Sequence, residues 1–265
     1  MILSPVKRLL LTIAILISVC SIARDKYATL TNGFAHNDYR HRRPLFDALH
    51  HGFSFIEADI YLHKGKLVVS HWPPLISRRK KTLEELYFKP LQDSLQFLQQ
   101  DGEPINLVID LKTSGNTVDI LFESLKNYTP LLSTLEHGCM IKRKITIILS
   151  GKIPTHLTSE QSRYLFLDRH FTDEGHRPAE AAGQYLLSSC KYKNLLTWDG
   201  QGSMPENQRQ LLVSYVTDAH AAGMKVRLWA SPENTGVWKA LLECGVDLIN
   251  TDRIEKLSRF LQKTP

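Results

Sequence analysis

Short apolar runs alternate with amphipathic stretches along most of the chain. Several of these runs are almost continuously apolar, as in Ile145–Leu149 (Ile-Thr-Ile-Ile-Leu), which is typical of strands that a parallel sheet buries on both faces. The runs lie near Thr31–Ala35, Phe53–Tyr61, Leu67–Ser70, Ile105–Leu111, Ile145–Ser150, Tyr164–Leu167, Leu195–Trp198, Lys225–Ala230 and Val246–Asn250.

Helical patterns fill the intervals between these runs. Pro44 begins one predicted helix and Gly52 ends it, the order expected for these two residues at helix ends. Further helices are predicted over Thr82–Gln99, where leucines recur at roughly helical spacing, and over Gln208–Ala222 and Val237–Leu242. Glycines follow the last two, at 223 and 245.

Strands that alternate with helices over about 240 residues predict a single-domain (β/α)8 TIM barrel without a sizeable cap insertion. The extra run Leu67–Ser70 follows Lys64-Gly65-Lys66, so we interpret it as the return strand of a hairpin. A doubly wound open sheet is the alternative. It usually has a glycine-rich turn after its first strand, and this chain has none there.

The first 23 residues have the pattern of a secretory signal peptide. Lys7 and Arg8 precede the apolar stretch Leu9–Val19, and Ser21-Ile22-Ala23 offers small residues to a signal peptidase. We therefore expect a barrel domain over residues 24–265 that is secreted or periplasmic. The alternatives are a lipoprotein anchored at Cys20 and a membrane anchor, although eleven apolar residues are short for a span of about 20.

The composition narrows the class of protein. The 265 residues are 43% hydrophobic and 23% charged, which is ordinary for a globular protein and excludes a disordered, collagen-like or coiled-coil chain. The net charge of +6 arises from 33 basic and 27 acidic residues, too evenly mixed to indicate nucleic-acid binding. It favours anionic partners, and the run Arg78–Lys81 could face anionic lipid head groups in a peripheral contact with a membrane. Oligomeric state stays open.

Polar residues close most of the predicted strands, which is where TIM-barrel enzymes place their catalytic groups. Glu57 and Asp59 are two apart on one strand, so both side chains point to the same side, as do those of Asp110 and Lys112. The residues at or near strand ends are His36-Asn37-Asp38, Glu57-Ala58-Asp59, His71, Asp110-Leu111-Lys112, Asp168, Asp199, Trp229 and Thr251-Asp252.

Buried carboxylates side by side repel each other, and a bound cation is the simplest compensation. Glu57, Asp59 and Asp110 would supply three hard oxygen ligands, suited to one divalent cation, Mg²⁺ or Ca²⁺, rather than Zn²⁺. A solvated strand face is the alternative for Glu57 and Asp59 alone. The neighbouring Phe55, Ile56 and Ile60 argue against it.

His36 and His71 are the candidate general acid and base. Histidine titrates near neutral pH, so a pair can take a proton from one oxygen and give one to another. They stand out among the 11 histidines because each closes an apolar strand. Lys112 could neutralise a non-bridging oxygen of a phosphodiester, or form a plain salt bridge to Asp110 or Asp59.

These residues, in this order, resemble the PI-PLC-like phosphodiesterase superfamily, which includes glycerophosphodiester phosphodiesterases and sphingomyelinase D-type phospholipases. The resemblance rests on His36, Glu57-Ala58-Asp59, His71 and Asp110-Leu111-Lys112, and on the C-terminal stretch Arg227–Asp252. The start His36-Asn37-Asp38-Tyr39 is most similar to the branch of altered inheritance of mitochondria protein 6.

The resemblance implies a TIM barrel and roles for the matched residues. Glu57, Asp59 and Asp110 would bind the cation, and His36 and His71 would be the acid–base pair. Lys112 and Trp229 would line the phosphate and head-group pocket, where we also place Asn37 as a substrate contact.

The chain also departs from the glycerophosphodiesterase pattern. The usual His-Arg-Gly is replaced by His36-Asn37-Asp38, and Asp110 stands where those enzymes mostly have glutamate. The sequence Pro-Glu-Asn-Thr occurs at Pro232–Thr235, on the wrong strand, and we interpret it as a coincidence or a loop of separate use.

The leading hypothesis is a metal-dependent phosphoric diester hydrolase of lipid metabolism, acting on a glycerophosphodiester or phospholipid-type substrate. If a substrate hydroxyl replaces water as nucleophile, the product is a cyclic phosphate, as in a sphingomyelinase D-like lyase. Two further alternatives are a non-catalytic phosphate- or lipid-binding barrel and a glycoside hydrolase barrel. The last has no use for two strand-end histidines and Lys112.

Overall fold

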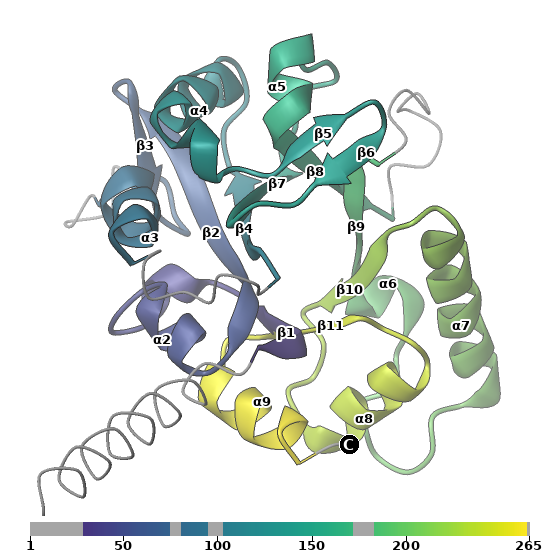
Figure 1. Ribbon diagram of the computed structural model, residues 1–265. Coiled ribbons are helices and arrows are strands. Elements are labelled where there is room, and N and C mark those ends of the chain that lie inside the picture. Colours follow the sequence, from purple (N-terminus) through teal and green to yellow (C-terminus); the bar gives the residue numbers. More distant parts are fainter. Residues whose placement is uncertain (1–28, 75–80, 95–102, 172–182, 264–265) are drawn as a thin grey trace, which may run out of the picture.

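The protein is a closed β-barrel surrounded by helices, as the computed structural model shows for residues 29–74, 81–94, 103–171 and 183–263 (Figure 1). Within these residues, eight parallel strands follow one another in chain order around the barrel, and β1 pairs with both β2 and β11, which closes the sheet. The predicted TIM-barrel fold is therefore confirmed. The strands are β1 (Leu30–Ala35), β2 (Phe53–His63), β4 (Ile105–Leu111), β7 (Ile145–Gly151), β8 (Leu165–His170), β9 (Tyr185–Lys191), β10 (Lys225–Trp229) and β11 (Leu248–Thr251).

Helices form an outer ring around these strands (Figure 1). The predicted helices after Pro44 and at 208–222 and 237–242 are present as α2, α7 and α8, with ends shifted by a few residues. The stretch predicted as one helix from Thr82 begins with a π-helical turn, η3. The helical segments are η2 (Asp38–Arg40), α2 (Phe46–His50), η3 (Glu84–Phe88), α3 (Lys89–Ser94), α4 (Thr117–Leu125), η5 (Lys126–Leu131), α5 (Ser159–Tyr164), α6 (Tyr192–Leu195), α7 (Glu206–Ala221), α8 (Thr235–Glu243) and α9 (Ile254–Leu261).

The extra apolar run is the return strand of a hairpin, as predicted. Strand β3 (Lys66–Val69) pairs with β2 in antiparallel fashion, with Ile60 opposite Val69. A second, smaller hairpin joins β5 (Thr134–Glu136) to β6 (Cys139–Ile141). The first hairpin matters for the candidate site because it brings His71, two residues beyond β3, back beside Asp59 of β2.

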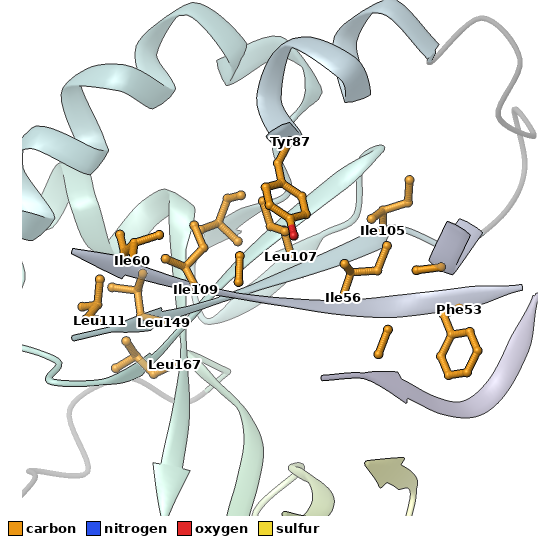
Figure 2. Packing of buried hydrophobic residues seen from close by; sticks show 14 of the residues in the cluster. Phe53, Ile56, Ile60, Tyr87, Ile105, Leu107, Ile109, Leu111, Leu149 and Leu167 are labelled. Carbon is orange, nitrogen blue, oxygen red and sulfur yellow. The ribbon is translucent and has the colours of Figure 1, made fainter. Parts of the chain in front are cut away.

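Side chains alternate between the barrel interior and the layer beneath the helices. The outer layer is the main hydrophobic core, where Tyr87 points from its helix toward the strand residues Leu107 and Ile109 (Figure 2). The base of the barrel interior is filled by a second apolar cluster: Phe34, Phe55, Val108, Ile148, Phe166, Leu187 and Leu248. Because strand side chains repeat every two residues, the next inward positions along the strands carry the polar residues.

The predicted strand at Leu195–Trp198 is wrong. The barrel strand between β8 and β10 is β9 (Tyr185–Lys191), and Leu195 lies in the short helix α6 instead. Ser188, which faces the helix layer, and Ser189, which faces the barrel interior, interrupt the apolar pattern of β9, so the more hydrophobic segment downstream looked more strand-like. Consequently Asp199 does not close a strand. It lies in a loop, where its carboxylate accepts the backbone N–H of Gln201.

Three predictions fall wholly or partly outside the described residues: the signal peptide with Cys20, Arg78–Lys80 of the basic run, and residues 95–99 of the helix predicted over Thr82–Gln99. Within the described part of the chain, no helix has the length and apolar composition needed to span a bilayer. The three cysteines there, Cys139, Cys190 and Cys244, form no disulfide.

Candidate active site

Three acidic side chains converge inside the barrel at the carboxyl ends of two neighbouring strands. Glu57 and Asp59 lie on β2 and Asp110 on β4, and the register places Asp59 directly beside Asp110. One carboxylate oxygen of each acid lies within 4.8 Å of the others. The structure thus brings together the three residues predicted as metal ligands, because two strands paired in parallel bring the ends of both to the same side of the barrel.

Burial of the three acids disfavours their ionised forms. Glu57 is almost fully buried, and burial, followed by the charges of Asp59 and Asp110, raises the pKa of its carboxyl well above the usual range. Its Oε2 accepts the backbone N–H of Asn37 at 2.6 Å. A cation bound beside Glu57 would favour the ionised form and so release the proton from this carboxyl.

Lys112 provides part of the compensating charge. Its ammonium lies 2.7 Å from Asp110 Oδ2 and 2.9 Å from Asp59 Oδ1, so it bridges the two strands. Burial disfavours the charged form of Lys112, but the two carboxylates outweigh it and raise the pKa of the lysine. The salt bridges considered from the sequence are therefore both present, and the lysine is held at the edge of the acidic cluster.

The acidic cluster fits a hard divalent cation. Its donors are carboxylate oxygens, as Mg²⁺ and Ca²⁺ prefer, and one lysine does not balance three ionised acids. Space beside Asp110 is kept open by Gly151 at the end of β7. A Cβ at this position would lie 2.1 Å from Asp110 Oδ1, and the backbone φ of +75° also favours glycine. The local structure thus preserves the position of the third acid.

His36 follows β1 and is oriented by a carboxylate from the other end of the chain. Its Nδ1 lies 2.7 Å from Oδ1 of Asp252, which follows β11. An ionised carboxylate only accepts, so this contact favours the neutral tautomer with the proton on Nδ1 and with Nε2 as the basic nitrogen. The side-chain amide of Asn37 also lies 2.8 Å from Nδ1. The hydrogen bond from His36 also helps to lower the pKa of Asp252 against the opposing effect of burial.

His71 is oriented in the same manner by one of the acids of the cluster. Its Nδ1 lies 2.8 Å from Asp59 Oδ2, and its ring packs edge-on against Trp72. The half-exposed ring therefore also carries its proton on Nδ1 and leaves Nε2 to act on a substrate. Both predicted acid–base residues thus have one ring nitrogen held by a carboxylate.

Asn37 and Tyr39 connect the surroundings of the two histidines. The Tyr39 hydroxyl lies 2.7 Å from Asn37 Oδ1 and 2.8 Å from Asp59 Oδ2, and Asn37 Nδ2 donates to Asp252. Burial and the charge of Asp59 raise the pKa of Tyr39, so the hydroxyl keeps its proton as a donor. Asn37, predicted to contact substrate, is buried and engaged within the protein.

The opposite wall of the barrel carries the remaining strand-end residues. Trp229 ends β10 and is partly buried, with the ammonium of Lys191 over its ring. Asp168 lies two residues before the end of β8, fully buried, where it accepts a hydrogen bond from Ser150 and faces Arg227. Trp229 is therefore at the mouth of the barrel, where it was predicted, and Asp168 lies below the mouth.

The sequence did not predict the roles of three residues of the site: Tyr39, Asp252 as the partner of His36, and Glu233. Asp252 could have been found, because it closes the last strand just as the acids of the cluster close theirs. Glu233, from the Pro-Glu-Asn-Thr segment, accepts hydrogen bonds from Thr251 Oγ1 and the Asp252 backbone, so this segment supports the partner of His36. Tyr39 belongs to the start His36-Asn37-Asp38-Tyr39, but its role depends on a contact with Asp59 of the neighbouring strand β2, which no local pattern indicates.

A TIM barrel with three acids, a lysine and two histidines at its strand ends is the arrangement expected of the PI-PLC-like phosphodiesterases. Comparison with known proteins confirms this resemblance. Residues 25–103 match the family model described as an AIM6-like phosphodiesterase domain. This segment contains His36, Glu57, Asp59 and His71.

The curated relatives support the same branch. The chain is 28% identical to altered inheritance of mitochondria protein 6 from Lachancea thermotolerans over 85% of its length, and 27% identical to the protein of that name from Eremothecium gossypii over 92%. It spans 64% and 72% of these two proteins. The chain is thus similar to this group, whose members are longer.

A solved structure agrees on the fold. A glycerophosphodiester phosphodiesterase from Parabacteroides distasonis superposes with a TM-score of 0.59 at 15% identity, over 89% of this chain and 98% of that one. At this identity the match concerns the fold alone. The solved structure therefore supports the TIM-barrel fold.

Proposed function

We propose that the protein is a metal-dependent phosphoric diester hydrolase that acts on a glycerophosphodiester or phospholipid-type substrate. The observation that carries the proposal is the pairing of two carboxylate-held histidines with one acidic cluster. His36 precedes Asn37, whose N–H is bonded to Glu57, and His71 contacts Asp59 directly. A binding protein would need neither histidine fixed in this way, whereas displacement at phosphorus needs a base and an acid.

The two histidines divide the proton transfers between them. One Nε2 takes the proton from the attacking oxygen as the new O–P bond forms. The other, protonated, gives its proton to the leaving oxygen as the old P–O bond breaks. Asp252 and Asp59 hold the rings in position and stabilise the imidazolium that each step requires, because an ion pair favours the charged form.

Positive charge for the phosphate would come from Lys112 and from the cation that the acidic cluster would hold. Glu57, Asp59 and Asp110 would hold a divalent cation, which when bound supplies positive charge to the phosphate oxygens. Lys112, already anchored between Asp59 and Asp110, adds a fixed positive charge for a non-bridging oxygen. Its two carboxylate contacts limit its freedom and so preorganise it.

The test is diester hydrolysis with matched variants. Activity on bis-p-nitrophenyl phosphate and on a panel of glycerophosphodiesters is measured with added Mg²⁺ or Ca²⁺ and with EDTA. His36→Gln should lower kcat/KM by about 10²-fold or more, the usual range for loss of an acid–base group. Glu57→Gln should abolish the stimulation of turnover by added metal, because it removes one of the three carboxylate ligands of the cation. His220→Gln is the matched control, because His220 forms a pair with Asp247 at 2.7 Å on the N-terminal side of β11, away from the site.

The products separate the alternatives. Phosphorus NMR that shows a monoester indicates water as nucleophile, whereas a cyclic phosphate indicates the lyase reaction. Metal-stimulated turnover that both site variants lose supports the proposal. Binding without turnover under either metal would leave a non-catalytic barrel, and activity that survives EDTA or both substitutions would refute the proposed mechanism.

Two further properties belong to the same proposal. We propose a secreted or periplasmic protein, from the pattern of residues 1–23, and a peripheral contact with an anionic membrane surface. Trp72 supports the contact, because its side chain is exposed next to His71. Aromatic rings and lysines beside an active-site mouth suit a lipid interface.

A further inference from the structure

The wall of the barrel mouth formed by β9 and β10 carries an aromatic ring with a cation placed over it. Trp229 and Lys191 are the last residues of these strands and are directly opposite each other in the register. Two residues earlier, Arg227 and Ser189 are joined by a hydrogen bond of 3.1 Å inside the barrel. Because strand side chains repeat every two residues, Trp229 and Lys191 share that inward side, one layer closer to the mouth.

The ammonium of Lys191 lies 5.4 Å from the centre of the Trp229 ring, a distance at which a cation is attracted to the face of an aromatic ring. Lys191 is exposed, and among residues 29–74, 81–94, 103–171 and 183–263 no carboxylate lies within ion-pair distance of it. Its charge is therefore available to a ligand at the mouth. The lysine is fixed against the ring without being neutralised.

The two walls of the mouth thus carry different charges. The β2–β4 wall carries the acids Glu57, Asp59 and Asp110 with Lys112 between two of them, whereas the β9–β10 wall carries Lys191 above Arg227, which faces Asp168 of β8. The guanidinium of Arg227 is itself buried, 4.2 Å from the ring centre of Phe34, and is 3.8 Å from its nearest acid, Asp168. A diester held by the acidic wall and its cation would extend its head group toward a positive wall.

An exposed aromatic face is the usual binding place for a quaternary ammonium group. In this protein a lysine of the chain itself occupies that face. From this geometry, and resting on the proposed phosphodiesterase function, we infer that Lys191 and Trp229 form a head-group subsite that selects anionic head groups and rejects quaternary ammonium. A second phosphate or a carboxylate would pair with Lys191, whereas a choline group would compete with it for the ring.

The test compares three diesters that share the glycerophosphate unit. They are glycerophosphoinositol 4-phosphate, with an anionic head group, glycerophosphoglycerol, with a neutral one, and glycerophosphocholine, with a fixed positive charge. The expected order of kcat/KM is anionic, neutral, cationic, with at least about a tenfold ratio between the first and the last, which corresponds to about 1.4 kcal/mol. Lys191→Met, which keeps the length of the side chain without its charge, should reduce that ratio about tenfold.

Lys193→Met is the matched control, because Lys193 is an exposed lysine two residues further on, in α6. It should leave the ratio unchanged. A wild-type preference for the choline diester, or an equal change of the ratio in both variants, would overturn the inference while leaving the phosphodiesterase function standing.

Absence of turnover on all three diesters would instead contradict the proposed function. Dissociation constants measured by calorimetry for the same compounds then test the subsite alone. A tenfold preference for the anionic compound that is lost in Lys191→Met supports the subsite, and equal affinities refute it.

Discussion

Replacing Asp38 with asparagine should remove a pH-dependent part of the protein's stability. Asp38 is fully buried, and its Oδ2 accepts the backbone N–H of Leu45 at 2.6 Å and the hydroxyl of Tyr87 at 2.9 Å. Burial raises the pKa of its carboxyl from 3.8 to about 6, although both hydrogen bonds act in the opposite direction. Between these two pKa values, the carboxyl of Asp38 is therefore protonated in the folded protein and ionised in the unfolded chain.

The size of the effect follows from the two pKa values. A difference between 3.8 and about 6, at about 1.4 kcal/mol per pH unit, corresponds to about 3 kcal/mol. Well below pH 3.8 the carboxyl is protonated in both states and the stabilisation is fully present. As the pH rises through 6, the folded state must ionise a buried group and the stabilisation is lost.

Urea unfolding from pH 4 to pH 8 measures this directly. The unfolding free energy of the wild type, relative to that of Asp38→Asn, should fall by about 2 kcal/mol between pH 4 and pH 7, since titration of all other groups cancels in the difference. Asparagine still offers an oxygen to Leu45 and Tyr87, so the variant should fold. Any constant offset between the two proteins does not enter the comparison.

Asp47→Asn is the control of opposite sign. Partial burial opposes ionisation of Asp47, but hydrogen bonds and charge from Arg43 outweigh it and lower the pKa of its carboxyl. Stability from this group is therefore lost as the pH falls. Parallel curves for the wild type and Asp38→Asn would refute the argument, because they would mean that Asp38 titrates alike in the folded and unfolded states.

Three further predictions concern the site and the core. Asp252→Asn should lower kcat for diester hydrolysis by about 10²-fold, since His36 loses the partner that fixes its basic nitrogen; rates within twofold of wild type would contradict this role. Gly151→Ala should shrink the thermal stabilisation by added Mg²⁺ or Ca²⁺, because its methyl group displaces the carboxylate of Asp110, and an unchanged shift would disprove it. Trp238→Ala should cost about 3–5 kcal/mol in urea unfolding, since Trp238 is fully buried in the outer core, and a loss below 1 kcal/mol would contradict that burial.

Much of the fold was predictable because its strands obey local rules. Continuous apolar runs such as Ile145–Leu149 are required wherever both faces of a strand are covered, so they identify buried parallel strands without tertiary information. The rule failed at β9, where Ser188 and Ser189 replace apolar residues. Ser189 lies in the polar layer of the barrel interior, bonded to Arg227, and this contact exists only once the barrel has closed.

The acidic cluster was predictable for a similar reason. The two-residue repeat of a strand puts Glu57 and Asp59 on one side, and parallel pairing then brings Asp110 beside them. The residues that hold the two histidines could not be predicted in this way. Tyr39 and Asp59 are joined by a hydroxyl that spans 20 positions of sequence, and the same Asp59 also binds His71 and Lys112. Such shared contacts leave no periodic pattern along the chain.

The sequence by itself determined most of the barrel strands, the acids that share one side of a strand and the two histidines at strand ends, because these depend on apolar runs and alternation. Only the tertiary structure decided which carboxylate serves His36. Asp252 lies 216 positions away and reaches the imidazole because β11 pairs with β1 to close the barrel. It likewise placed Lys191 over Trp229, since that contact needs the register of β9 against β10. The local pattern of a strand decides which side of the sheet a side chain faces. Which side chain of another strand it then contacts is decided by the pairing of the strands in the closed barrel.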